Sequence, residues 1–392
     1  MDGAGGLTLS LASCLKDVRR EAWDAVANPP SRPFDPFMSW DFLEALEASG
    51  CATGRTGWAP MHLLAHAPSG ALVGAMPLYL KSHSYGEYVF DRGWADALER
   101  AGGRYYPKLQ SAAPFTPVTG RRLLTADPDP EIERALIAGA LDAARQSGAS
   151  SLHITFLTGE EQARIKPYGL MARTGVQFHW DNAGYAKFDD FLGVLSSGKR
   201  KTIRRERTRA CEGLVIKSLS GGDLREADWD FFFDCYKDTG ARKWGSPYLN
   251  RNFFSIVGER MADRIVLFVA EENGQPIASA LNFVGGDTLY GRYWGRLRER
   301  DFLHFELCYY RAIDLAIERG LKRVEAGAQG EHKLARGYGP APTYSSHWIA
   351  HAGLRQAVGR FLAQETPAMA DEIEYLAEHT PFRKGAAPDE IS

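Results

Sequence analysis

The sequence predicts an α/β (α+β) protein of two related domains, each a mixed, mainly antiparallel sheet flanked by helices. Three observations favour this fold. The chain has 392 residues, which is the length of two ordinary domains. Residues 63–80 and 267–284 both show a strand, a tight turn and a strand at matched length. Residues 135–157 and 309–328 both show a helix, a stop at glycine and a strand.

The two halves share an order of elements rather than residue identities. In each half an antiparallel meander leads into a helix and a further strand, which predicts a mixed sheet and not a doubly wound one. We place the first domain at residues 1–185 and the second at 186–365, with a C-terminal helix and tail over 366–392.

In the first half, capping residues mark the helices. Ser39 or Asp41 suits the start of a helix that ends before Gly50, and Pro130 suits the first turn of a helix that runs to about Gln146. The other elements expected here are a helix near 18–27, a hairpin over 61–67 and 71–80, irregular chain over 104–120 and a strand over 151–157.

In the second half, one apolar stripe predicts the central helix, over 304–319, with Gly320 as its stop. The stripe consists of Phe305, Cys308, Tyr309, Ala312, Ile313, Ala316 and Ile317. The other elements expected here are a helix over 229–239, strands over 265–271, 277–284, 288–294 and 322–326, and a last helix over 366–379.

Composition excludes several classes of protein. The net charge is −2, so the whole molecule is not a polycation for nucleic acid. The five cysteines are scattered with no CxxC pair, which argues against a disulfide framework and a structural zinc site, and we find no metal-ligand constellation. We expect no secretory signal and no membrane span, and a cytoplasmic location fits the cysteine usage.

A basic segment lies between the halves. Seven of the residues from 196 to 209 are lysine or arginine, with Glu206 as the one acidic residue. The segment is either a solvated helix or an anion site, because guanidinium groups bind phosphates well. Candidate ligands are the phosphates of coenzyme A or an RNA backbone.

The loop 327–333 follows a predicted strand, where ligands gather in α/β folds. Its glycines allow a close approach of backbone amides to a ligand. Glu331 or His332 suits a general base toward an amine, and Lys333 or Arg336 suits a phosphate or carboxylate. The alternative is a surface loop with a salt bridge from Glu331 to Lys333 or Arg336.

A polar cluster in the first half is a candidate acceptor pocket, although a plain surface explains it equally well. Its residues are Lys81, His83, Glu87 and Asp91, with Tyr105, Tyr106 and Lys108.

Four long segments carry a resemblance to a known family: residues 83–120, 197–207, 293–321 and 327–348. Through them the chain resembles the Fem-like N-acyltransferases of the GNAT superfamily, described as peptidoglycan biosynthesis or recognition proteins. The resemblance covers roughly residues 30 to 380. It implies tandem GNAT-like domains, in which the strands 288–294 and 322–326 splay apart and admit an acyl donor.

In such a fold the donor's pyrophosphate would meet the loop 295–303 and the start of the helix that follows it. Ordinary GNAT enzymes carry Arg/Gln-x-x-Gly-x-Gly/Ala there. This chain has Arg292-Tyr-Trp-Gly295-Arg-Leu297, which lacks the last small residue. Fem-type ligases also lack the motif and take aminoacyl-tRNA as their donor.

We therefore predict an N-acyltransferase that moves an acyl group from acyl-CoA, a co-substrate rather than a tightly bound cofactor, to an amine. The alternatives are a Fem-type aminoacyl-tRNA-dependent transferase acting on a cell-wall precursor, with tRNA as a partner, and a non-catalytic cell-wall ligand-binding protein. The expected catalytic residues are Glu331, His332 and Lys333. The expected donor residues are Arg296, Arg298, Arg300, Phe302, His304, Lys201, Arg204 and Arg205. The expected acceptor residues are His83, Glu87, Tyr106, Lys108, Gln329 and Arg336.

Overall fold

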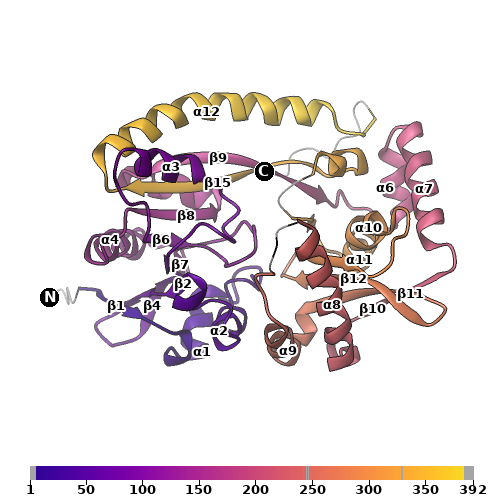
Figure 1. The fold of residues 1–392 in the computed structure, drawn as a ribbon, viewed down its shortest axis with the longest axis horizontal. Helices are drawn as coiled ribbons and strands as arrows, with labels where there is room; N and C mark the ends of the chain where they lie inside the picture. The colour runs from indigo at the N-terminus through magenta and orange to yellow at the C-terminus, as the bar shows by residue number, and fades with distance from the viewer. Residues whose placement is uncertain (1–5, 244, 246, 328–329, 384–392) are drawn as a thin grey trace. The chain divides into compact units, whose positions relative to one another are not determined.

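The computed structural model describes residues 6–383 apart from 244, 246, 328 and 329 (Figure 1). It divides into two compact units. Unit 1 comprises Met1–Gly175 and Pro342–Asp371, and unit 2 comprises Val176–Ala341 and Glu372–Ser392. No helix in the described part is both long enough and apolar enough to span a membrane.

This division differs from the predicted boundaries because the chain changes unit three times. It does so inside β9 (Met171–Asp181), inside β15 (Gly339–Ile349) and inside α12 (Ala352–Glu378). Residues 342–365 of the predicted second domain, and residues 366–371 of the predicted C-terminal helix, therefore belong to unit 1. Each crossing lies within a regular element and has no composition change to mark it.

Unit 1 contains two sets of paired strands. One is an antiparallel sheet in the order β1-β3-β4-β7, and the other follows the order β15-β8-β6-β5-β2, in which β6 and β8 are parallel. The strands are β1 (Thr8–Ala12), β2 (Trp58–Pro60), β3 (His62–His66), β4 (Leu72–Met76), β5 (Tyr79–Lys81), β6 (Lys108–Ser111), β7 (Leu124–Thr125) and β8 (Ser151–Leu157). The helices are α1 (Arg20–Ala27), α2 (Trp40–Ala48), α3 (Arg92–Arg100), α4 (Pro130–Gln146) and α5 (Gly159–Ile165).

Two predictions for this unit were wrong. The strand expected over 71–80 is interrupted at Pro77, and its parts β4 and β5 pair in different sheets. Proline has no amide hydrogen to donate to a ladder, so the strand breaks there. The segment 104–120, expected to be irregular, contains β6, which lies between β5 and β8.

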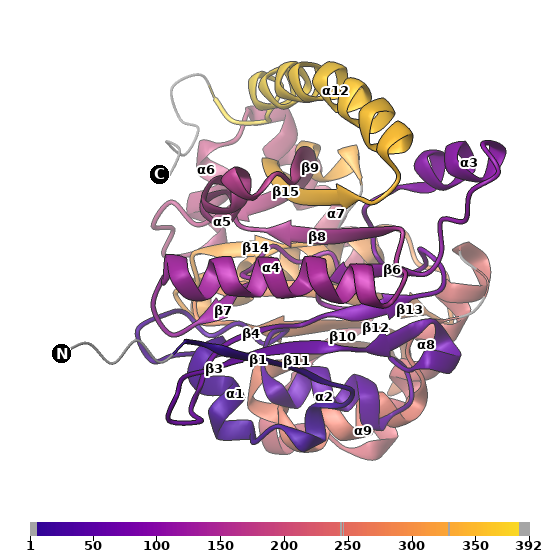
Figure 2. The same ribbon diagram turned by 90° about the vertical axis from the view of Figure 1, so that its left-hand side faces the viewer.

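Helix α4 covers one face of these strands (Figure 2). Two residues fix the start of α4. The Asp129 side chain accepts hydrogen bonds from the amides of Glu131 and Ile132, and Pro130 has no amide hydrogen that would need a partner in the first turn. The buried residues of this core are aliphatic: Leu136, Ile137, Ala140, Leu109, Leu152 and Ile154.

Unit 2 has one sheet in the order β10-β11-β12-β13-β14-β9. Helices α8 and α9 lie on one side of it, and α6, α7, α10 and α11 lie on the other (Figure 1). The strands are β10 (Leu214–Leu219), β11 (Ile265–Glu272), β12 (Gln275–Val284), β13 (Thr288–Arg296) and β14 (Arg323–Glu325). The helices are α6 (Phe188–Val194), α7 (Ser197–Cys211), α8 (Glu226–Lys243), α9 (Arg251–Arg260), α10 (Leu303–Phe305) and α11 (Arg311–Glu318), with a π-helical turn at Glu306–Tyr310.

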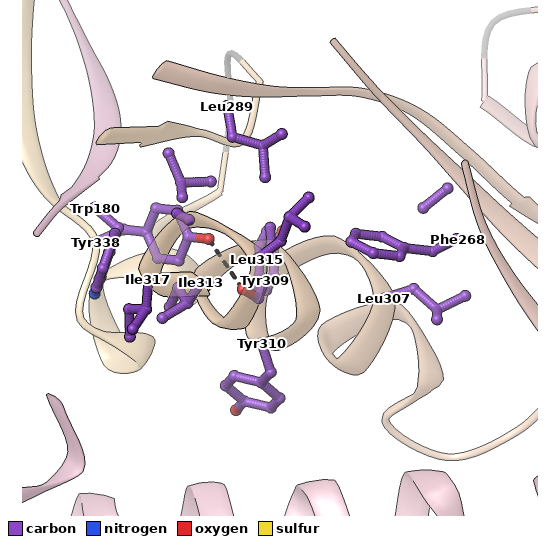
Figure 3. Packing of buried hydrophobic residues seen from close by; sticks show 14 of the residues in the cluster. Trp180, Phe268, Leu289, Leu307, Tyr309, Tyr310, Ile313, Leu315, Ile317 and Tyr338 are labelled. Carbon is purple, nitrogen blue, oxygen red and sulfur yellow. Dashed lines mark hydrogen bonds between the residues drawn. The ribbon is translucent and has the colours of Figure 1, made fainter. Parts of the chain in front are cut away.

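The predicted central helix is confirmed, and its apolar stripe packs in the core of unit 2 (Figure 3). Ile313 and Ile317 are buried with Trp180 and Phe268. The Tyr338 hydroxyl donates to the Tyr309 carbonyl at 3.3 Å, which satisfies one carbonyl in the widened π turn.

We predict that Gly295→Ala destabilises the protein. A Cβ at Gly295 would lie 1.9 Å from the Cys235 carbonyl oxygen of α8, so backbone would have to move. We expect the free energy of unfolding to fall by about 1–3 kcal/mol in urea titrations. Gly193→Ala, in α6 with no atom within 4 Å of its new Cβ, is the control. Equal stability of the two variants would contradict the close contact.

Candidate functional site

The central strands of unit 2 diverge as the resemblance implies. β13 and β14 pair in parallel over only three residues, ending at Tyr290 and Glu325. β13 then continues to Arg296, with a bulge at Arg292 that shifts its register against β12. Beyond the last pair, the two strands leave an opening between them.

A cavity of about 90 Å³ lies at this opening. Aromatic rings form much of its wall, since the rings of Trp294 and His304 lie 4.8 Å apart and those of His304 and Tyr309 lie 5.3 Å apart. The π turn places Cys308 and Tyr309 together on the cavity wall, and π turns often occur at functional sites. The full lining is Ala280, Leu281, Asn282, Gly291, Arg292, Tyr293, Trp294, His304, Cys308, Tyr309 and Ala326.

Buried charged groups lie beside this cavity. Arg292 on β13 contacts Glu325 on β14 at 3.3 Å, and His179 on β9 lies 4.0 Å from the same carboxylate. The Arg292 side chain is only 2% exposed. Burial and the neighbouring cations keep the pKa of His179 well below its usual range, so this imidazole is neutral. Its Nδ1 has no hydrogen-bond partner among the described residues.

Lys333, a predicted catalytic residue, is 1% exposed and its Nζ donates to the Gly327 carbonyl at 2.7 Å. Burial, and next the charge of Arg292, lower the pKa of Lys333 to about 7. Its amine can therefore both release and accept a proton near neutral pH.

Of the other residues predicted in this segment, the structure describes the side chains of His332 and Arg336, and neither lies in the buried cluster. His332 is exposed and its Nε2 pairs with the Tyr309 hydroxyl at 2.8 Å. Arg336 donates to Glu206 at 2.9 Å and lies over the Phe305 ring, so its contacts are those of a packed structural residue. Gln329 and the side chain of Glu331 lie outside the described residues.

The arginines expected to hold the donor are paired with carboxylates of the chain. Arg296 contacts Glu299 at 2.8 Å, and both Arg298 and Arg300 contact Glu272 at 3.2 Å. The amide of Leu297 donates to the Ile277 carbonyl, so it continues the β hairpin.

The start of the helix after this loop contributes one residue to the cavity. Phe302 caps α10 in the left-handed region at φ 63°, and its ring does not line the cavity. Among the expected donor residues, His304 alone lies on the cavity wall.

The predicted basic helix is confirmed as α7, whose buried side carries Ile203, Glu206 and Ala210. Arg204 pairs with Asp189 at 2.8 Å. Lys201 and Arg205 are exposed and form no ion pair with a described residue. These two side chains present free positive charge on the outer face of α7.

The acceptor residues predicted for unit 1 are partly brought together. Lys108 donates to Glu87 at 2.6 Å and to Ser84 at 2.7 Å, and Ser84 in turn lies 2.8 Å from the Tyr106 hydroxyl. His83 is apart from them and its Nε2 pairs with the Thr56 carbonyl.

Sequence reasoning missed Glu325 and His179 as site residues. A glutamate inside a predicted strand, between Val324 and Ala326, was the available signal, because a charged side chain in such a strand needs a partner. The partners come from two other strands far away in the sequence, and their pairing was not predictable.

Comparisons with known proteins agree with this architecture. The crystal structure of FemX aligns with a TM-score of 0.56 at 14% identity, over 87% of this chain and 98% of FemX. The C-terminal domain of a "Putative Lysylphosphatidylglycerol Synthetase" from Agrobacterium fabrum aligns with a TM-score of 0.52 at 10% identity, over 93% and 99%. At these identities the likeness shows the fold alone.

Two curated Mycobacterium tuberculosis proteins, from strains CDC 1551 and H37Rv, are 25% identical over 308 residues. Both are named "Putative 8-amino-7-oxononanoate synthase 2". The match takes in 74% of this chain but 39% of each relative, so the chain spans about two fifths of their length.

The fold of each unit and the splayed strands define a tandem GNAT-like fold. The model of the FemAB-like family, described as peptidoglycan biosynthesis/recognition, matches residues 14–384. The chain belongs to this family.

We predict that Lys333 makes stability depend on pH. Its pKa is about 7 when folded and about 10.5 when unfolded, so the unfolded chain binds more protons between these values and stability rises with pH. From pH 7 to 9 the wild type should gain about 2 kcal/mol relative to Lys333→Met, measured by urea unfolding. Lys199→Met, on the exposed face of α7, is the control for loss of a lysine. Parallel pH profiles for wild type and Lys333→Met would refute the burial of a titrating amine.

Proposed function

We propose that this protein is an N-acyltransferase that moves an aminoacyl group from an activated ester to an amine acceptor. The observation that carries the proposal is the cavity between β13 and β14, with the buried Glu325 and Lys333 near it. A nucleophile and an activated carbonyl can meet there, away from bulk water, between a base and an acid.

In the proposed reaction the acceptor nitrogen attacks the carbonyl carbon of the donor. The C–N bond forms, the C–O bond of the ester breaks, and the donor leaves as its alcohol. Glu325 takes the proton from the attacking amine, and Arg292 holds this carboxylate in place at 3.3 Å. The Lys333 ammonium supplies a proton to the leaving oxygen, which its pKa of about 7 allows.

The contacts within the loop 295–303, which would meet the pyrophosphate of CoA, favour an aminoacyl ester over acyl-CoA as the donor. A CoA pyrophosphate needs free amides and cations in this loop. Here the Leu297 amide is used by the β hairpin, and Arg298 and Arg300 share Glu272. Fem-type ligases take aminoacyl-tRNA, and membership of the FemAB-like family supports the same donor class for this chain.

The acceptor that we propose is a free amine on a cell-wall precursor. The family description, peptidoglycan biosynthesis/recognition, supports this class of acceptor. The cavity of about 90 Å³ fits a small group such as one aminoacyl unit and not a whole precursor, so most of the acceptor would bind outside it.

We expect Glu325→Gln to lower turnover by about 10²- to 10⁴-fold with the fold retained, because the amide cannot accept the proton. The assay offers aminoacyl-tRNA, acetyl-CoA and longer acyl-CoAs as donors to a cell-wall precursor peptide with a free amine, and detects the product by mass. Glu318→Gln, exposed on α11, is the matched control.

Product from aminoacyl-tRNA alone would support the proposed donor. Product from acyl-CoA would replace it with acyl-CoA. If no donor gave product, the transferase proposal would fail and a non-catalytic ligand-binding role would stand in its place.

We expect the exposed face of α7 to contact the phosphates of the tRNA donor. The double variant Lys201→Ala/Arg205→Ala should weaken tRNA binding about tenfold and lower the slope of log affinity against log salt by about 2. Filter binding at several salt concentrations measures both. The control is the double variant Lys16→Ala/Arg19→Ala, which removes two exposed positive charges outside α7. An unchanged slope in the α7 variant would show that these cations do not contact the RNA.

A further inference from the structure

Unit 1 contains a sheet face that is polar and fully buried. Strand register pairs Tyr79 with Gln110, Lys81 with Lys108, and Gln110 with His153. Paired residues on neighbouring strands point to the same side, so these five side chains share one face. None is more than 2% exposed. The opposite face carries the aliphatic core under α4.

Two lysines and two carboxylates meet at this face. Lys108 Nζ donates to Glu87 Oε2 at 2.6 Å and to Asp91, whereas Lys81 Nζ stays 3.7 Å from Glu87 Oε1. The Lys81 ammonium lies 3.6 Å from the centre of the Trp58 ring. Buried ion pairs of this kind add little stability over apolar residues of the same volume, so stability alone does not explain the cluster.

Two carboxylate oxygens at the cluster, Glu87 Oε1 and Asp91 Oδ1, have no hydrogen-bond partner among the described residues. Gln110 Oε1, on the same face of the sheet, has none either. Buried polar atoms are nearly always satisfied in folded proteins, and a group of unsatisfied ones calls for a missing partner. Because a carboxylate or amide oxygen accepts, the missing partner is a hydrogen-bond donor.

The chain that borders this face has a strained backbone. Phe115 and Tyr88 have φ of 62° and 59°, in the left-handed region that aromatic residues rarely adopt. The Phe115 amide donates to the Gly86 carbonyl at 3.2 Å, and its ring lies 5.0 Å from that of Trp58. Such strain persists where surrounding contacts fix the chain, and it is common at ligand sites.

We propose that this face of unit 1 is a ligand site for a primary ammonium group, held by Glu87 and Asp91. The ammonium supplies the donors that the orphaned carboxylate oxygens need. The rings of Trp58, Tyr105 and Tyr106 already surround the lysine ammoniums, which is an environment suited to a further cation. The half-buried Ser84 and Tyr106, joined at 2.8 Å, form the outer edge of the cluster.

Charge balance allows a third cation. Burial lowers the pKa of Lys81 to about 7, so this lysine can lose its proton as a ligand cation arrives. Lys108 and the ligand then balance the two carboxylates. This binding proposal goes beyond the transfer reaction and does not depend on it.

The test measures the melting temperature of the full chain with ethylammonium chloride, with 1-propanol as the neutral analogue and sodium chloride at matched ionic strength. We expect ethylammonium at ten times its Kd to raise Tm by about 3 °C, and 1-propanol to leave it unchanged. Glu87→Gln should abolish the rise. Glu325→Gln, in unit 2, should keep it, and exposed Glu99→Gln is the surface control.

The proposal is overturned if ethylammonium gives no rise, if 1-propanol gives an equal rise, or if the rise survives in Glu87→Gln. A rise lost in Glu325→Gln would place the amine in unit 2 and also overturn it. If Glu87→Gln does not fold, Glu87→Asp decides the matter, since it keeps the negative charge and withdraws the carboxylate by one methylene. We expect its Kd for ethylammonium to rise at least about threefold, and an unchanged Kd would overturn the placement. The test contains no acyl donor, so it measures amine binding alone. Its outcome therefore does not depend on whether the transferase proposal holds.

Discussion

The short pairing of β13 with β14 is the constraint on which the rest of unit 2 depends. Three residue pairs hold the strands together, and beyond Tyr290 and Glu325 the backbone groups of β13 have no partner on β14. That separation leaves room for the cavity and directs the bulged Arg292 toward Glu325. The helix that begins at Leu303 then closes one side of the opening with His304. A sheet paired along its full length would have no such interior space.

Charge is distributed differently inside the site and around it. Glu325 and Lys333 are buried, where weak screening makes each charge effective over several ångströms. Arg298 and Arg300, in the loop 297–302, lie toward solvent and are paired with Glu272, and ion pairs exposed to solvent contribute little to stability. The arginine-rich loop was the conspicuous feature of the sequence, but the chemistry that we propose rests on the less conspicuous buried groups.

Local patterns predicted most of the fold. The apolar stripe of the central helix, the helix start at Pro130 and the splayed strands depend on spacing within a short segment or on the family resemblance, and the structure confirms them. The break at Pro77, the strand β6 and the unit boundaries depend on which distant strand pairs with which, and no local signal encodes that. The same reason hid Glu325, whose neighbours His179 and Arg292 come from strands far away in sequence. Lys333 was predicted from its loop, although its burial was not.

The π turn at Glu306–Tyr310 has a consequence for how the helix evolves. It holds one more residue than an α-helical turn, so the part before it is rotated by about 100° relative to a regular helix. His304 can therefore face the cavity while Ile313 and Ile317 keep to the core. Loss of a single residue in the turn would restore the regular α-helical repeat. His304 would then rotate away from the cavity, whereas Ile313 and Ile317 would stay in the core. The inserted residue thus lets the ligand-facing surface change in evolution while the core sequence stays fixed.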